Sequence, residues 1–161
     1  MLSGHARGFA DDVLKMIAGK GGYIGIAIPP PFLLPPAGDG RAQKLGKPAG
    51  WATLNTVVDH VQHMLNVAGT DHVGIGTDWG KPYYNALSWT AEMVNEPTAG
   101  FDWVGWRPQD RFDPNMQVAG METWDKWPNL TAALLRRGIA ESTVVKIVGG
   151  NFLRVMREVC G

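Results

Sequence analysis

Asp78 is the first candidate for a carboxylate that takes part in chemistry, because it follows a short apolar run at residues 72–76. Such a run is typical of a strand that is buried on both faces. The carboxyl end of a buried parallel strand is a favoured place for chemistry in α/β proteins. A structural alternative stands beside this, in which Asp78 binds backbone amides of the following turn. The position of Asp78 alone leaves both interpretations open.

Two histidines, His60 and His63, lie three residues apart on an expected helix. This spacing can bring two imidazoles near one metal ion, but no third ligand is evident, so structural roles are favoured. His72 lies six residues before Asp78, which is about 20 Å along an extended strand, so these two side chains cannot share an ion. We therefore assign His72 to the opposite end of the strand, which serves stability.

Other common site motifs are missing from the sequence. Gly74 and Gly76 lack the third glycine of a dinucleotide-binding loop, and glycines inside a strand more often permit close packing. Neither a nucleophile-elbow serine nor a phosphate-binding Lys-Ser/Thr loop occurs. The one cysteine, Cys160, has no partner for an internal disulfide.

The composition of the 161 residues is that of a globular protein, with 45% hydrophobic and 19% charged residues. Lysine plus arginine and aspartate plus glutamate both number 15, which does not indicate nucleic acid or an anionic membrane as a partner. The richest apolar run, residues 23–37, contains five prolines and is too short to be a transmembrane segment. The N-terminus does not resemble a signal peptide, so the expected location is cytoplasmic.

Apolar periodicity predicts the elements that position these residues. Helices are expected at residues 10–18, 53–68, 129–137, 141–148 and 151–159, and strands at 23–28 and 72–76. The order of strand, helix and strand predicts a parallel βαβ unit with a right-handed crossover. Residues 29–50 read as a loop rich in proline and glycine. Residues 80–127 read as an irregular, Trp-rich insertion, either a lid over a pocket or a loop that packs on its own aromatic side chains.

Two strands are too few for a parallel sheet that is covered on both faces. The length of the chain is that of one complete domain, but the pattern of elements favours part of a larger α/β barrel or sheet. We therefore expect residues 1–161 to form a single partial domain that contains the Trp-rich insertion.

Several stretches, taken in order, resemble the C-terminal portion of the membrane (renal) dipeptidase family of zinc peptidases. Each stretch is weak alone, but their order and approximate spacing hold over nearly the whole chain. The stretches are Arg7-Gly8-Phe9-Ala10-Asp11-Asp12-Val13-Leu14, Gly21-Gly22-Tyr23-Ile24-Gly25, Asp59-His60, the stretch from Asp71 to Gly80, the stretch from Pro128 to Gly138, and Gly149-Gly150-Asn151-Phe152-Leu153-Arg154-Val155.

The resemblance implies an amidohydrolase-like (β/α)₈ TIM-type barrel that hydrolyses dipeptides at a dinuclear zinc site. It implies that Asp78 is catalytic and lies at the metal pair, where it handles the proton of the attacking water. Arg7 matches an arginine that is associated with the substrate carboxylate. The family's other zinc ligands have no match in this chain, and His5 does not match a ligand histidine. The second acidic residue of the family's Asp-Phe-Asp-Gly is also missing, since this chain reads Asp78-Trp79-Gly80.

We therefore predict a dipeptidase-type metallohydrolase, present as a C-terminal fragment that is inactive alone. Its partners would be a dipeptide or related small amide, and either a polypeptide that supplies the N-terminal half of the barrel or further copies of the chain. A non-catalytic remnant, or a split subunit that works only with such a partner, is the alternative. A small binding module built on the Trp-rich segment is the third possibility.

Overall fold

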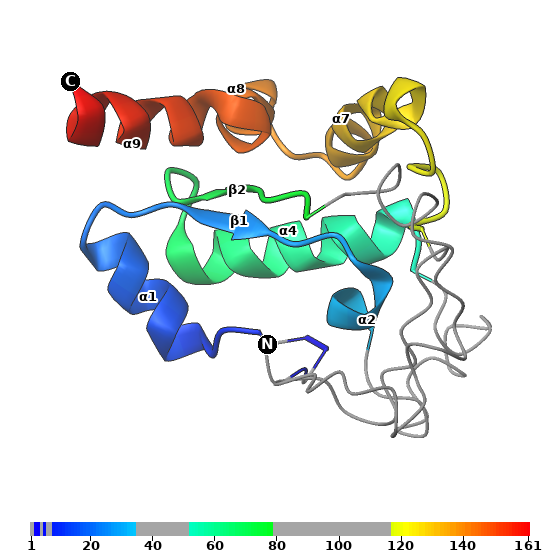
Figure 1. The fold of residues 1–161 in the computed structure, drawn as a ribbon, viewed down its shortest axis with the longest axis horizontal. Helices are drawn as coiled ribbons and strands as arrows, with labels where there is room; N and C mark the ends of the chain where they lie inside the picture. The colour runs from blue at the N-terminus through cyan, green and yellow to red at the C-terminus, as the bar shows by residue number, and fades with distance from the viewer. Residues whose placement is uncertain (1, 4, 6–7, 35–51, 79–116) are drawn as a thin grey trace, which may run out of the picture.

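The computed structural model describes residues 2, 3, 5, 8–34, 52–78 and 117–161. Two parallel strands, β1 (Ile24–Ile26) and β2 (Val73–Ile75), lie at the centre of this part of the chain (Figure 1). Gly25 pairs with Gly74 in the register of the two strands. Helix α4 (Leu54–Ala68) lies between them in the sequence. The parallel strand–helix–strand unit is therefore confirmed.

Further helices lie before this unit, within it and after it along the chain. They are α1 (Asp11–Gly19), α2 (Pro30–Leu33), a 3-10 helix (Trp124–Lys126), α7 (Pro128–Arg136), α8 (Glu141–Val145), a π-helical turn (Lys146–Gly150) and α9 (Asn151–Cys160). The predicted helices at 10–18, 53–68 and 129–137 are confirmed to within one residue at each end. The pair predicted at 141–148 and 151–159 is joined by the π-helical turn.

One local prediction was wrong, because residues 30–33 of the expected loop form α2. Pro30 is the first residue of this helix, where its fixed backbone angle is compatible with helical geometry and its missing N–H is not needed. The rest of that loop, residues 35–51, and most of the Trp-rich insertion, residues 79–116, lie outside the described residues. The division of residues 1–161 into one partial domain with an insertion stays a prediction.

The helices cover the strand pair on two sides, with α4 along one side and α8 and α9 along the other (Figure 1). Helix α4 supplies Val57, Val58 and Val61 to the core, and each is at most 1% exposed. They recur at helical spacing, which is why one stripe of α4 faces the strands. The helix ends at Gly69, whose positive φ of 86° suits a residue without a side chain.

Glycines let the two strands and a tyrosine ring approach closely. A Cβ atom at Gly25 would lie 2.8 Å from the backbone nitrogen of Gly76. A Cβ atom at Gly74 would clash with the ring and hydroxyl of Tyr23, and that hydroxyl donates a hydrogen bond to the carbonyl oxygen of Ile75 (3.0 Å). The prediction that strand glycines serve close packing is therefore confirmed.

Two side chains of α9 hold the segments that lead into both strands. Asn151 is 2% exposed, and its Nδ2 donates to the carbonyl oxygens of Thr70 and Val73, at 2.8 Å each. Arg154 Nη2 donates to the carbonyl oxygens of Gly21 (3.1 Å) and Asp71 (2.9 Å). These four acceptors lie in and before the two strands, so the Asn-x-x-Arg pair fixes the strands from their amino ends.

Candidate functional site

A cavity of about 420 Å³ lies beside β1, between α1, α2 and α4. Its walls are mostly apolar, with a few polar groups among them. Such a composition is typical of sites that hold a ligand or another part of a protein. The lining residues are Leu2, Ser3, Gly8, Phe9, Leu14, Ile24, Gly25, Ile26, Ala27, Phe32, Leu33, His60, His63, Met64 and Asp78.

Asp78 lies at the rim of this cavity, three residues beyond the end of β2. Its side chain is exposed, and its φ of +45° places it in the left-handed region. Aspartate tolerates that region better than most residues do, and it adopts this conformation in ordinary turns as well as at functional sites that hold backbone strain. The turn that follows Asp78, from residue 79 on, lies outside the described residues, so the turn-binding alternative stays open.

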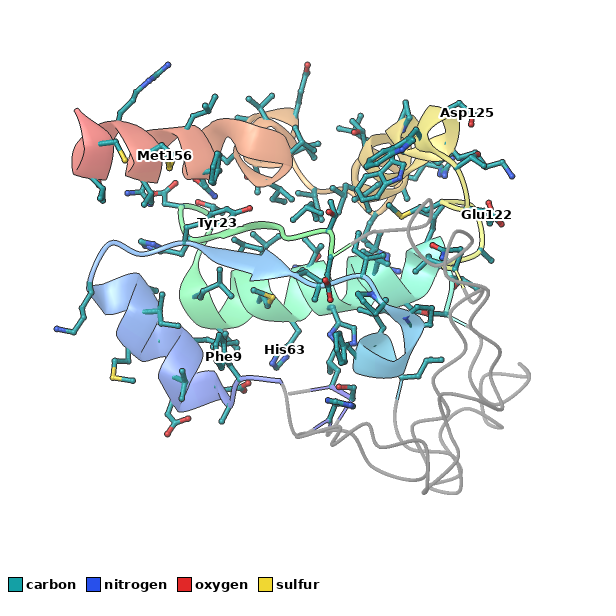
Figure 2. All side chains as sticks on the ribbon, viewed as in Figure 1. Phe9, Tyr23, His63, Glu122, Asp125 and Met156 are labelled. Atoms are coloured by element: carbon teal, nitrogen blue, oxygen red, sulfur yellow. The ribbon has the colours of Figure 1, made fainter. Side chains whose placement is uncertain are left out.

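The two histidines of α4 line the cavity, but each already has a protein partner. His60 Nε2 donates to the carbonyl oxygen of Leu33 at 2.8 Å, which joins α4 to α2. His63 Nε2 lies 2.8 Å from Oδ1 of Asp11, which joins α4 to α1. Figure 2 shows His63 on the side of the strands where Phe9 and α1 lie. The structural interpretation of the two histidines therefore has direct support.

The same contacts set the electrostatics of the cavity. Burial lowers the pKa of the His60 imidazole, although its hydrogen bond to Leu33 acts in the opposite direction. The hydrogen bond from His63 holds the pKa of the Asp11 carboxyl below its ordinary value. A neutral His60 and an ionised Asp11 are therefore the favoured states at neutral pH.

The lowered pKa of His60 predicts how stability depends on pH. A histidine whose pKa is lower in the folded state takes up a proton more readily when unfolded, so stability is complete above its unfolded pKa of about 6.5 and falls as pH decreases through the folded value. We expect the melting temperature to fall between pH 7.5 and pH 5, and the slope to be shallower in His60→Gln, which keeps an N–H donor for Leu33. Thermal unfolding followed by circular dichroism measures both slopes, and equal slopes would contradict the assignment.

The described residues do not fit the dinuclear zinc centre that the resemblance implies. No group of three or more His, Cys, Asp or Glu side chains with metal-binding geometry occurs within the described ranges. His60 and His63 use Nε2 in protein contacts, and Asp78 is the only carboxylate that lines the cavity in the described part of the chain. The described residues therefore do not form such a centre by themselves.

The other predicted features have mixed outcomes. Arg7 lies outside the described residues, so its role stays a prediction. His72 Nδ1 lies 2.8 Å from the carbonyl oxygen of Gly22, before the strands begin, which agrees with its assignment to the stability end. Of the tryptophans, Trp124 and Trp127 are described, and their rings lie 5.5 Å apart, away from the cavity. None of the helices in the described ranges is long and apolar enough to cross a membrane.

Sequence reasoning missed most of the cavity wall. Ser3 and Phe32 line it, and His5 is fully buried with its ring 4.9 Å from that of Phe32. Ser3 and His5 lie outside the regular elements and Phe32 lies in the short helix α2, so no apolar periodicity predicts that these side chains converge. A weak signal was the aromatic residue Phe9 within the Arg-x-Phe stretch before α1.

Solved structures share the fold of this chain. An amidohydrolase from Pseudomonas aeruginosa superposes with a TM-score of 0.63 and 26% identity, over 97% of this chain and 42% of that protein. The probable dipeptidase PvdM from the same organism superposes with a TM-score of 0.54 and 20% identity, over 92% of this chain and 40% of that protein. These relatives are TIM-barrel proteins, so the predicted fold class, part of an α/β barrel, is confirmed.

Curated relatives are dipeptidases of fungi. Dipeptidase tcpJ from Claviceps purpurea is 36% identical over 67% of this chain and 18% of its own length. Dipeptidase verJ from Clonostachys rogersoniana is 30% identical over 96% of this chain and 28% of its own length. The chain thus spans about a quarter of the length of the curated relatives that it matches.

A family model described as membrane dipeptidase, peptidase family M19, matches residues 1–88 and 97–160. The match includes Asp78, the Asn-x-x-Arg pair of α9 and the helix that carries both cavity histidines. Since the model matches most of its length, the chain belongs to the membrane dipeptidase family.

Proposed function

We propose that the chain supplies part of the active site of a dipeptidase-type hydrolase, in which Asp78 handles the proton of the attacking water. The observation that carries this proposal is the geometry of Asp78, an exposed carboxylate with no bound partner in the described structure, held beyond a parallel strand at the rim of a cavity. Family membership and the names of the fungal relatives support the choice of reaction.

In this reaction, water adds to the carbonyl carbon of the peptide bond. Asp78 accepts a proton from that water as the C–O bond forms. The same carboxyl then returns the proton to the amine as the C–N bond breaks, which leaves an amino acid with a new carboxylate and one with a free amine. Arg7 would hold the substrate's terminal carboxylate through paired N–H donors, and this role rests on the sequence match alone.

We further propose that catalysis needs barrel units beyond the described residues. Two observations support this. The chain covers less than half of the length of its relatives, and the described part of its sheet has only two strands. The zinc ions implied by the family would take their remaining ligands from those units. Without them the chain would act as a split subunit, or be a non-catalytic remnant.

Metal content and dipeptide hydrolysis, measured together on purified residues 1–161, test this proposal. We expect well below the two zinc ions of a dinuclear site and no hydrolysis above background when the chain is alone. We expect both to rise when the remaining barrel units are supplied. A chain that alone binds about two zinc ions and cleaves dipeptides would contradict the need for a partner. An assembled barrel that binds zinc but cleaves no dipeptide would contradict the reaction class.

A further inference from the structure

A hydrogen bond joins the first residue of α1 to the middle of α4. His63 Nε2 lies 2.8 Å from Oδ1 of Asp11, which is 52 positions away in the sequence. Ala10 occupies the N-cap position of α1 and has no side chain that could cap the helix. The beginning of α1 is therefore held by a contact from another helix instead of by a side chain at its N-cap.

The residues just before this contact line the cavity that Asp78 also lines. Gly8 and Phe9 both belong to its wall, and Phe9 is 54% exposed, so much of its ring is available to a molecule in the cavity. His63 lines the same cavity (Figure 2). The Asp11–His63 contact thus fixes a helix whose preceding residues share a cavity with the candidate catalytic carboxylate.

Helix α4 makes a second contact of the same kind, and this one lies elsewhere. Asp59 Oδ1 pairs with Arg137 Nη1 at 2.6 Å, which joins α4 to the end of α7. Neither Asp59 nor Arg137 is among the described residues that line the cavity. Both pairs are partly exposed to solvent, where such pairs contribute little to overall stability. The two pairs therefore differ mainly in what they position, and of the two only the Asp11–His63 pair borders the cavity.

We propose that Asp11 and His63 are positioning residues for the proposed reaction. Their hydrogen bond fixes the first turn of α1 and so holds residues 8–9 in the cavity wall, in contact with a substrate bound beside Asp78. Arg7 directly precedes these residues in the sequence, so its proposed role on the substrate carboxylate depends on the same hydrogen bond. Groups that are held in place before the substrate arrives lose less conformational entropy on binding, so the effect falls on substrate affinity. This role rests on the proposed function, but the contact itself is a property of the described structure.

Amide hydrogen exchange on purified residues 1–161 tests whether the contact fixes α1. The Leu14 N–H donates to the carbonyl oxygen of Ala10 (3.1 Å), so its exchange reports opening of the first turn. We expect His63→Ala to speed Leu14 exchange by about tenfold, and Asp59→Ala, the matched control on the same helix, to change it by less than about twofold. The Gly69 amide at the end of α4 should exchange at the same rate in both variants, which shows that α4 stays folded. Equal Leu14 exchange in the two variants would overturn the proposal.

Steady-state kinetics of the assembled enzyme separate positioning from a merely structural role. We expect His63→Ala to raise KM for a dipeptide by about tenfold while kcat changes by less than about threefold. His63→Gln keeps an N–H donor for Asp11 and should restore most of the wild-type KM. Asp59→Ala should leave both constants unchanged. A loss of folded protein would instead lower the concentration of active enzyme, and so lower the apparent kcat without a change in KM.

The kinetic outcomes distinguish this role from the proposed function. A raised KM in His63→Ala alone, rescued by His63→Gln, supports the positioning role. A wild-type assembly that cleaves dipeptides, with the same KM in His63→Ala and Asp59→Ala, would refute the positioning role and leave the reaction in place. A wild-type assembly that cleaves no dipeptide would refute both.

Discussion

Asp78→Asn is expected to lower kcat/KM for dipeptide hydrolysis by about 10²–10⁴-fold in the assembled enzyme, which is the usual loss when a general base is removed. Asparagine keeps the size of the side chain and tolerates the positive φ of 45°, so the fold should persist. It cannot accept the proton of the attacking water. The effect should therefore fall on kcat, with a smaller change in KM.

Asp71→Asn is the matched control for this substitution. Asp71 lies before β2, at the opposite end of the strand from Asp78, where its carboxylate pairs with Lys146. Both side chains are exposed, so removal of that ion pair costs little stability. Steady-state kinetics should show unchanged kcat/KM for this variant. Equal kinetics for the two variants would remove Asp78 from the catalytic role.

The largest effect on stability is expected from Asn151→Asp. The new side chain has nearly the same shape, but it presents oxygen atoms where Asn151 Nδ2 now donates to the carbonyl oxygens of Thr70 and Val73. The site is 2% exposed, so water cannot compensate for the lost donors or for the buried charge. We expect the free energy of unfolding to fall by about 2–4 kcal/mol at pH 7, measured by urea denaturation.

Asn129→Asp tests whether this cost comes from burial. Asn129 is exposed and donates a single hydrogen bond, to the carbonyl oxygen of Gly120 (3.0 Å). It lies in the first turn of α7, where a negative charge interacts favourably with the helix dipole. The change in unfolding free energy should stay below about 1 kcal/mol. A similar fall in the free energy of unfolding in both variants would show that burial of the Asn151 contacts is not the cause of the destabilisation.

The fold was predictable where a simple period links sequence to structure. The apolar stripe of α4 and the β-branched runs of β1 and β2 produce elements close to those expected, because burial of one face or both faces requires that spacing. Helix α2 was not predictable in this way. Three consecutive prolines indicate an interruption of a strand, but they do not show that Pro30 will begin a helical turn.

The candidate site was predictable only in part. Asp78 could be singled out from the sequence because it follows a predicted strand, and the carboxyl ends of parallel strands are a favoured place for catalytic residues. The contact between Asp11 and His63 joins residues 52 positions apart, and no local sequence pattern predicts such a long-range contact. For the same reason the role of Asn151 emerged only with the structure, since its acceptors lie 78 and 81 residues earlier.

The long reach of Asn151 and Arg154 has a consequence for how the chain folds during synthesis. The backbone groups that they bind belong to residues made 78 to 133 positions earlier. At roughly 5–20 residues added per second, about 4–16 s pass between synthesis of the start of β2 and synthesis of Arg154. During that interval the strand pair lacks α9, and its apolar surfaces are open to chaperones and to aggregation. Variants that slow translation between β2 and α9 should therefore lower soluble yield without changing the folded protein.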